Sequence, residues 1–345
     1  MSWAFAEGVT PTLGVQALLI PQSATTGGMP GRGLWAVSPE TGQVWSDRVV
    51  GPNNTLFMTP FKVIVSPDNT YLLSDQTRNA VYEIGLDGTL LRTVVSVVQP
   101  RGILLHDGHL YVPVGQNTAD PFTQNTVHRY TLTGEPAGLE TYPNGSPSPV
   151  FSRPANYADR TPAPWDLLFH GGQMLLSNFH NSGGGNPVMP DVFRIDMTTG
   201  EAIPLVVDPL GLSGAQQLFP MPNGGFAVAA FSNTFETGVN TTGIYVYDAN
   251  GIQSDYYNLA FGPRGIYRMA NGDWLFSTAD GLRLLNGVTR DPNGVQIAGT
   301  DNGQFRMITL GPALTRQVIP EPAGLMTAVA GATVLLWRRR TAARA

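Results

Sequence analysis

The amino-acid sequence predicts an all-β fold, a six-bladed β-propeller, and three observations support this prediction. Charged residues make up 13% of the chain, about half of the roughly 25% found in typical soluble domains. The 345 residues include 40 glycines and 28 prolines, which suits many tight turns and disfavours a helical protein. A unit of four short apolar segments also recurs along residues 12–310. Repeats of this kind are the usual sequence signature of a propeller.

The clearest copy of the repeat begins at residue 61. Its four apolar segments, at residues 61–66, 71–74, 80–84 and 90–95, alternate with turns rich in Pro, Asp, Asn and Gly. This pattern predicts an antiparallel meander of four strands. Further copies begin at residues 100, 164, 216 and 263. Their spacing of 39 to 64 residues is close to the roughly 40–50 residues of a propeller blade.

A sixth copy, at the N-terminus, lacks its first strand. It consists of apolar segments at residues 15–20, 33–37 and 43–47. We expect residues 304–310 to supply the missing strand, because pairing the two ends closes the ring and removes the edges of an open sheet. The predicted propeller domain therefore spans residues 7–311 with six blades, and seven blades are the alternative.

Polar residues stand where each first strand is expected to begin, around one end of the central channel. Groups of this kind at such positions could line a pocket for a polar or anionic ligand. The alternative is that they bond to one another and fill the channel together with ordered water. The candidate ligand-binding residues are Lys62, Arg101, Trp165, Asp166, Gln217 and Arg264, with Gln216 beside them.

Long loops are expected around the same end of the channel. Insertions between second and third strands occur at residues 115–126, 178–191 and 232–242, and a further loop, residues 142–164, is expected to join two blades. Surface loops often carry binding residues. A cation such as calcium would need three converging ligands, for which the candidates are Asp166, Asn178 and His180, with Asn233 and Asp280 as further oxygen donors.

The blade pattern is similar to that of NHL-type and gluconolactonase-like propellers. Two copies begin with Pro-Arg-Gly-Ile, at Pro100 and Pro263, followed by a turn and a second apolar strand. The resemblance implies the fold and leaves the chemistry open. Gluconolactonase-like enzymes hold a divalent cation in the channel with a Glu, Asn and Asp set, and we place no glutamate at an inner position of these repeats.

The sequence contains no clear catalytic constellation. It has no cysteine, which excludes disulfides, thiol nucleophiles and thiolate metal sites, and it shows neither a nucleophile elbow nor a dinucleotide fingerprint. We therefore predict a non-catalytic protein without a cofactor that binds a glycan or a protein. The alternative is a metal-dependent hydrolase or lactonase-like enzyme with a cation in the channel.

The last 26 residues differ from the repeats. An uncharged segment of 15 residues, 323–337, lies between a Pro-Glu-Pro motif and three arginines. As a helix it would reach roughly 22 Å at 1.5 Å per residue, whereas a full membrane span needs about 20 residues. A short helical anchor is therefore predicted after a linker at residues 312–319. Its defining residues are Pro320, Glu321, Pro322, Arg338, Arg339 and Arg340.

This tail resembles the PEP-CTERM sorting signal of exported proteins of Gram-negative bacteria. The resemblance implies recognition and cleavage by an exosortase-type membrane protease. The arginines are expected to stay on the cytoplasmic side, so the protein would cross the inner membrane, be tethered there transiently and then reach the cell surface or the extracellular matrix. A C-terminal helix packed on the domain is the alternative.

The N-terminus and the net charge agree with export and with a partner other than nucleic acid. Ala4-Phe5-Ala6 has the spacing that precedes a signal-peptidase cut, so residues 1–6 are predicted to be a signal-peptide remnant, and chance spacing is the alternative.

Without the last 26 residues the chain has 16 basic and 24 acidic residues, a net charge of −8. Binding to nucleic acid needs a concentrated basic surface, so this class of partner is disfavoured.

Overall fold

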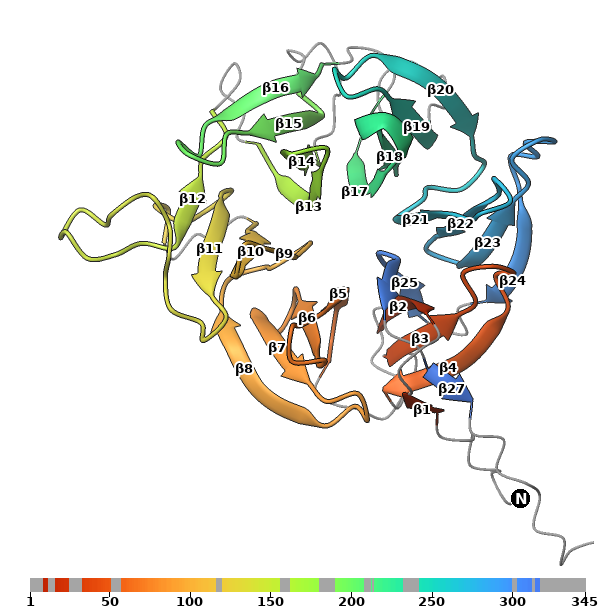
Figure 1. The fold of residues 1–345 in the computed structure, drawn as a ribbon, viewed down its shortest axis with the longest axis horizontal. Helices are drawn as coiled ribbons and strands as arrows, with labels where there is room; N and C mark the ends of the chain where they lie inside the picture. Colours follow the sequence, from red (N-terminus) through yellow and green to blue (C-terminus); the bar gives the residue numbers. More distant parts are fainter. Residues whose placement is uncertain are drawn as a thin grey trace, which may run out of the picture.

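The computed structural model describes residues 9–11, 16–24, 33–50, 57–115, 120–155, 162–179, 190–207, 212, 214–231, 242–299, 303–311 and 314–316. Within these residues the chain forms five antiparallel sheets of four strands and one of five, which are arranged as blades around a central axis (Figure 1). The prediction of an all-β, six-bladed propeller is therefore confirmed, and the seven-bladed alternative is wrong.

Five blades are formed by consecutive strands that pair in order from the axis outwards. Blade 2 contains β5 (Pro60–Val65), β6 (Tyr71–Asp75), β7 (Ala80–Ile84) and β8 (Leu90–Ser96). Blade 3 contains β9 (Leu104–His106), β10 (His109–Pro113), β11 (Val127–Thr131) and β12 (Val150–Ser152). Blade 4 contains β13 (Pro164–His170), β14 (Gln173–Asn178), β15 (Val192–Ile195) and β16 (Ala202–Val206). Blade 5 contains β17 (Ala215–Pro220), the 3-10 turn η1 (Pro222–Gly224), β18 (Phe226–Ala230), β19 (Gly243–Tyr247) and β20 (Gln253–Asn258). Blade 6 contains β21 (Gly265–Arg268), β22 (Trp274–Ser277), β23 (Gly281–Leu285) and β24 (Val295–Gly299).

Blade 1 joins the two ends of the chain. Its strands β2 (Ala17–Ala24), β3 (Gly33–Val37) and β4 (Val44–Val50) come from the N-terminal region. On its inner edge, β2 pairs with two C-terminal strands, β25 (Gly303–Phe305) and β26 (Thr309–Gly311). The expected closure of the ring by a C-terminal strand is thus confirmed.

The closing segment differs from the single strand that we expected. It is split between β25 and β26, and the residues between them form no strand. The Met307 N–H donates instead to the Phe61 carbonyl of blade 2 at 3.4 Å, so the interruption links blade 1 to its neighbour. A further pair, β1 (Val9–Pro11) with β27 (Leu314–Arg316), follows the closing strands and lies beside β4 in Figure 1, so part of the predicted linker is paired.

The loop predicted at residues 142–164 was assigned wrongly, because it contains the outer strand of blade 3. β12 pairs with β11 through an irregular register. Its three residues lie between Pro149 and Pro154, and a segment this short shows no readable two-residue period. The residues on either side of β12 are therefore connections within and between blades.

The hydrophobic core lies between the blades. Successive residues of a strand point to opposite faces, so Leu73 packs against blade 1 whereas Leu72 packs against blade 3. Clusters of buried side chains of this kind fill all six interfaces between neighbouring blades within the described residues. Each blade therefore depends on both neighbours, and the axis is left for polar groups.

The two predicted terminal signals lie outside the described residues, namely the remnant at residues 1–6 and the anchor at residues 320–345. In the part of the chain that the structure describes, no helix is long and apolar enough to cross a membrane.

Candidate functional site

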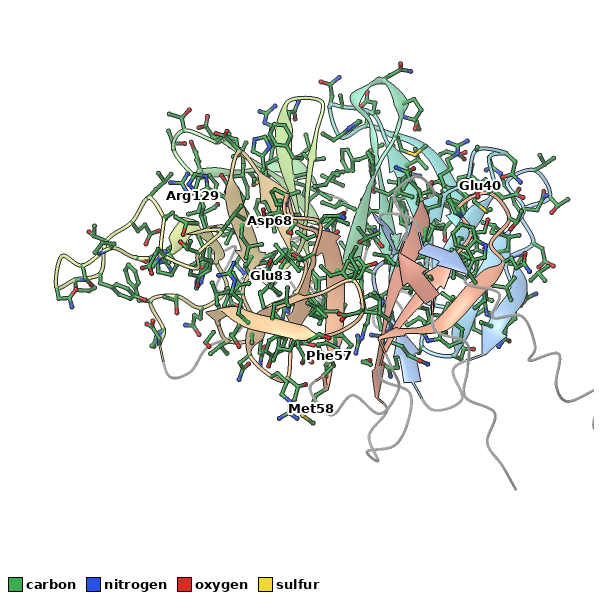
Figure 2. All side chains as sticks on the ribbon, turned by 60° about the horizontal axis from the view of Figure 1, so that its bottom comes forward. Glu40, Phe57, Met58, Asp68, Glu83 and Arg129 are labelled. Carbon is green, nitrogen blue, oxygen red and sulfur yellow. The ribbon has the colours of Figure 1, made fainter. Side chains whose placement is uncertain are left out.

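The candidate site lies at the end of the axis where the inner strands begin, which we call the entrance end. Seen from the side in Figure 2, Phe57 and Met58, which lead into β5, lie at the opposite end of blade 2 from Asp68 in the β5–β6 turn. Asp75, at the end of β6, holds the segment that precedes β5, because its carboxylate accepts the Met58 and Thr59 N–H groups at 2.6 and 3.0 Å. From the entrance end inwards, two layers of polar side chains lie along the axis.

The deeper layer, which we call the axial layer, consists of Lys62, Asp166 and Gln217. The Lys62 ammonium lies 2.6 Å from Asp166 Oδ1, and the two side chains are 9% and 0% exposed. Lys62 belongs to blade 2 and Asp166 to blade 4, so the pair reaches past blade 3. It can do so because blade 3 has Gly102 at this level, where a Cβ would come within 2.3 Å of Asp166 Oδ1.

The remaining bonds of the axial layer tie further blades together. Asp166 Oδ2 accepts the Leu218 N–H of blade 5 at 3.0 Å. Gln217 Oε1 accepts the N–H groups of Ile266 at 3.0 Å and Ile308 at 2.8 Å, from blades 6 and 1. Burial raises the pKa of the Asp166 carboxyl, and the Lys62 ammonium and the backbone N–H groups oppose this rise. These predicted ligand-binding residues thus bond to each other and to neighbouring strands.

The outer layer contains three arginines, Arg101, Arg264 and Arg306, which we call the arginine triad. Each stands one residue nearer to the entrance end than the axial layer, in blades 3, 6 and 1. The Arg101 guanidinium lies over the Trp165 ring at 4.2 Å, as expected of a cation–π contact. The other two lie over Phe231 at 4.5 Å and over Phe61 at 5.4 Å.

Arg101 is buried, Arg264 and Arg306 are half-buried, and all three guanidinium groups remain cationic at neutral pH. Burial lowers the pKa of Arg101 and of Arg264 to about 10. Burial also lowers the pKa of Arg306 to about 9, and the charge of Arg264 contributes to this shift. Arg101 Nη1 donates to the Pro164 carbonyl at 2.7 Å, and Arg306 Nε donates to Ser23 Oγ at 3.1 Å. Within the described residues none of the three forms a salt bridge.

Sequence reasoning missed Arg306. It lies in the segment that was expected to close the ring, at the same level as Arg101 and Arg264, but the Pro and Gly that flank those two arginines are absent around it. Aligning Ile308 with Ile266 as the first core residue of each inner strand would have found it.

Aromatic and amide groups complete the outer layer. Trp165 Nε1 donates to Gln216 Oε1 at 3.2 Å. The Trp165 ring stacks on Phe179 at 4.4 Å and meets Phe61 edge-on at 5.3 Å. Aromatic faces and amide groups beside cations are typical of sites for polar ligands.

The metal candidates within the described residues are hydrogen-bonded to other groups of the protein. The Asn178 amide is already engaged, since its Oδ1 accepts the Ala163 N–H at 2.6 Å and its Nδ2 donates to the Pro190 carbonyl at 2.7 Å. Asp280 lies in blade 6 and accepts from Thr278 Oγ1 at 2.7 Å. His180 and Asn233 lie outside the described residues. Across the described part of the chain, no three His, Cys, Asp or Glu side chains are placed to hold a metal ion.

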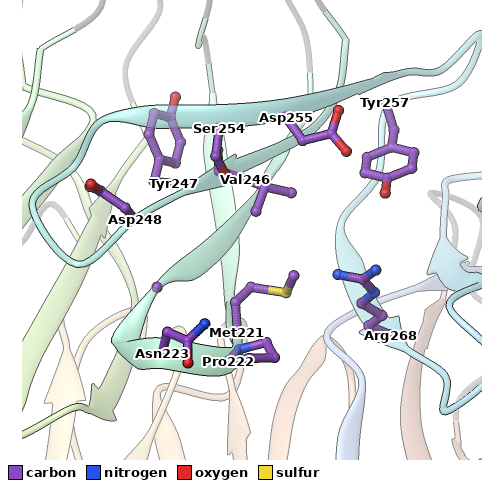
Figure 3. Close-up of a pocket in the computed structure, with 11 residues that line it drawn as sticks. Met221, Pro222, Asn223, Val246, Tyr247, Asp248, Ser254, Asp255, Tyr257 and Arg268 are labelled. Atoms are coloured by element: carbon purple, nitrogen blue, oxygen red, sulfur yellow. The ribbon is translucent and has the colours of Figure 1, made fainter.

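A separate pocket of about 480 Å³ lies between blades 5 and 6, at the end opposite the entrance end. Figure 3 shows the Arg268 guanidinium pointing towards the Tyr257 hydroxyl. Met221 and Val246 contribute apolar side chains to the lining of the same pocket. Arg268 lies 5.6 Å from the Trp274 ring. None of the residues predicted from the sequence lines this pocket.

Comparisons with solved structures show the fold. One similar structure is a chain of a nidogen/laminin complex, with a TM-score of 0.58 and 10% identity over 86% of this chain and 98% of that chain. Another is a putative 6-phosphogluconolactonase from Bacteroides uniformis, with a TM-score of 0.50 and 14% identity over 86% and 99%. A putative gluconolactonase also matches, with a TM-score of 0.48 and 16% identity over 75% and 90%. No protein-family model and no curated protein matches the chain.

Proposed function

We propose that this chain is an exported, non-catalytic β-propeller that binds a polar ligand, a glycan or a protein, at the entrance end. The observation that carries the proposal is the engagement of Asp166. Its two oxygens take the Lys62 ammonium and the Leu218 N–H, so a catalytic cation at this carboxylate would have to displace a buried ammonium group. The outer layer, with its cations, aromatic rings and amide, supports binding of a polar ligand in place of metal-assisted hydrolysis.

Export and display complete the proposal. The tail that begins at Pro320 would act as a temporary membrane anchor and as the substrate of an exosortase-type protease. The support is its order of turn motif, apolar segment and Arg338–Arg340 cluster. β27 ends at Arg316, so only a few residues separate the last paired strand from this motif.

The experiment that tests the proposed function combines calcium dependence with ligand screening. We expect the full chain to bind members of a panel of glycans and matrix proteins equally with and without a chelator. We also expect its melting temperature to be indifferent to calcium, and no calcium-dependent hydrolysis of lactones. Stoichiometric metal, whose removal lowers the melting temperature by many degrees and abolishes lactone hydrolysis, would establish the metal-dependent enzyme instead.

A further inference from the structure

The arginine triad places three positive charges at a buried or half-buried layer of the axis. A desolvated cation without a counter-ion is costly, yet within the described residues the carboxylate of the axial layer, Asp166, is taken by Lys62. The buried Nε atoms of Arg101 and Arg264 have no hydrogen-bond acceptor there. These two N–H donors are therefore unsatisfied, and a bound oxyanion would supply the missing acceptor.

Two of the arginines also repel each other. Arg264 and Arg306 lie in neighbouring blades, and the positive charge of Arg264 lowers the pKa of Arg306. Like charges that interact at a partly desolvated site raise the free energy of the folded protein. A negative group bound near both would offset this repulsion, which supports anion binding beside the unsatisfied N–H donors of the layer.

Each guanidinium lies over an aromatic ring, at 4.2 to 5.4 Å from the ring centroid. The planar guanidinium presents several N–H donors, which can form paired hydrogen bonds with oxyanions. We propose that Arg264 and Arg306, with Arg101 beside them, form an oxyanion site for a carboxylate, sulfate or phosphate group of the ligand. This inference rests on the proposed binding function and specifies the chemistry of the ligand.

The first test measures the melting temperature of the full chain with sodium glucuronate, sulfate or phosphate, against sodium chloride at equal ionic strength. An anion at about twenty times its Kd should raise the melting temperature by roughly 2–5 °C. Comparison of the three anions shows which oxyanion the site prefers. If none of them raises the melting temperature above that in chloride, the inference is overturned.

Variants show whether the effect arises at the arginine triad. In Arg264→Gln and Arg306→Gln we expect at least about tenfold weaker binding of the preferred anion, since a charged hydrogen-bonding partner is lost. Without anion, these variants should melt no lower than the wild-type chain, because mutual repulsion is relieved. Arg268→Gln, which changes the pocket between blades 5 and 6, is the control and should bind the anion normally.

Two results contradict the inference. One is that the anion effect survives in Arg264→Gln and Arg306→Gln while both variants unfold more easily, which would show a structural role. The other is that the effect is lost in Arg268→Gln alone. In either case, binding of neutral glycans by the same chain would still support the proposed function, whereas the absence of any ligand in the screen would remove the proposed function as well.

Discussion

Lys62 and Asp166 come from blades 2 and 4, and at their level blade 3 presents Gly102, which has no side chain. Any larger residue there would collide with Asp166, because its Cβ would come within 2.3 Å of Oδ1. Replacing one partner of such a buried pair leaves an uncompensated charge, which typically costs about 3–5 kcal/mol. A glycine at this position thus permits an ion pair between blades 2 and 4, one level deeper than the arginine triad.

His128 in β11 provides a residue-scale test of pH dependence. Its Nε2 lies 3.1 Å from the Thr123 carbonyl, which can only accept, so Nε2 carries the proton. Its Nδ1 then accepts from the Tyr130 hydroxyl at 2.8 Å. Because the ring is buried among these partners, its pKa is lowered from 6.5 to about 4.

We therefore expect the free energy of unfolding to fall as the pH falls from 6.5 to 4. In this range the unfolded chain binds a proton that the folded His128 excludes, which amounts to about 3 kcal/mol. Urea unfolding at pH 7 and pH 4 measures the difference. The His128→Gln variant should lose most of this pH dependence, and an equal pH dependence in variant and wild type would contradict the assignment to His128.

At the scale of the strands, three serines link alternate blades to the next blade in the ring. The hydroxyls of Ser74, Ser177 and Ser277 donate to the carbonyls of Arg101, Gln216 and Arg306 at 2.5, 2.6 and 2.6 Å. Each serine lies in the second strand of blade 2, 4 or 6, and its partner lies in the outer layer of the next blade. Two of these serines thus hold the main chain of Arg101 and Arg306, and the third holds that of Gln216.

The Ser177→Ala variant should reduce the free energy of unfolding by about 1–3 kcal/mol, because the Gln216 carbonyl remains buried without its donor. Urea unfolding at pH 7 measures the change. Ser146→Ala is the matched control, since Ser146 is exposed and bonds to Asn144 within its own turn, and it should change stability by less than about 0.5 kcal/mol. Equal stability of the two variants would show that the link between blades contributes little.

At the scale of the whole molecule, closure of the ring depends on the last paired strands. Without β25 and β26, the inner edge of β2 would be open, and open edges favour aggregation. We expect the chain truncated after Gly299 to aggregate. The chain truncated after Arg316 should melt at the same temperature as the full chain and remain in the soluble fraction, whereas the full chain should fractionate with membranes. Identical fractionation of these last two chains would contradict the proposed anchor.

Much of the fold could be predicted because it depends on local sequence patterns. Four short apolar segments per repeat, with turns between them, predicted the blades, and the incomplete N-terminal repeat predicted closure by residues 304–310. The outer strand of blade 3, at Val150–Ser152, was missed because three residues show no period. The split between β25 and β26 was missed because it depends on a bond from Met307 to blade 2.

The sequence by itself determined most of the polar residues at the start of the inner strands, because that position follows from the repeat, but it did not identify Arg306 in the closing segment. Only the tertiary structure decided which of them pair. Lys62 and Asp166 are 104 residues apart and bond across a blade, and the charge of Arg264 acts on Arg306 because the two ends of the chain close the ring. The repeat specifies how deep along the axis each polar side chain lies. Its bonding partner depends on the side chains that the other blades place at the same depth.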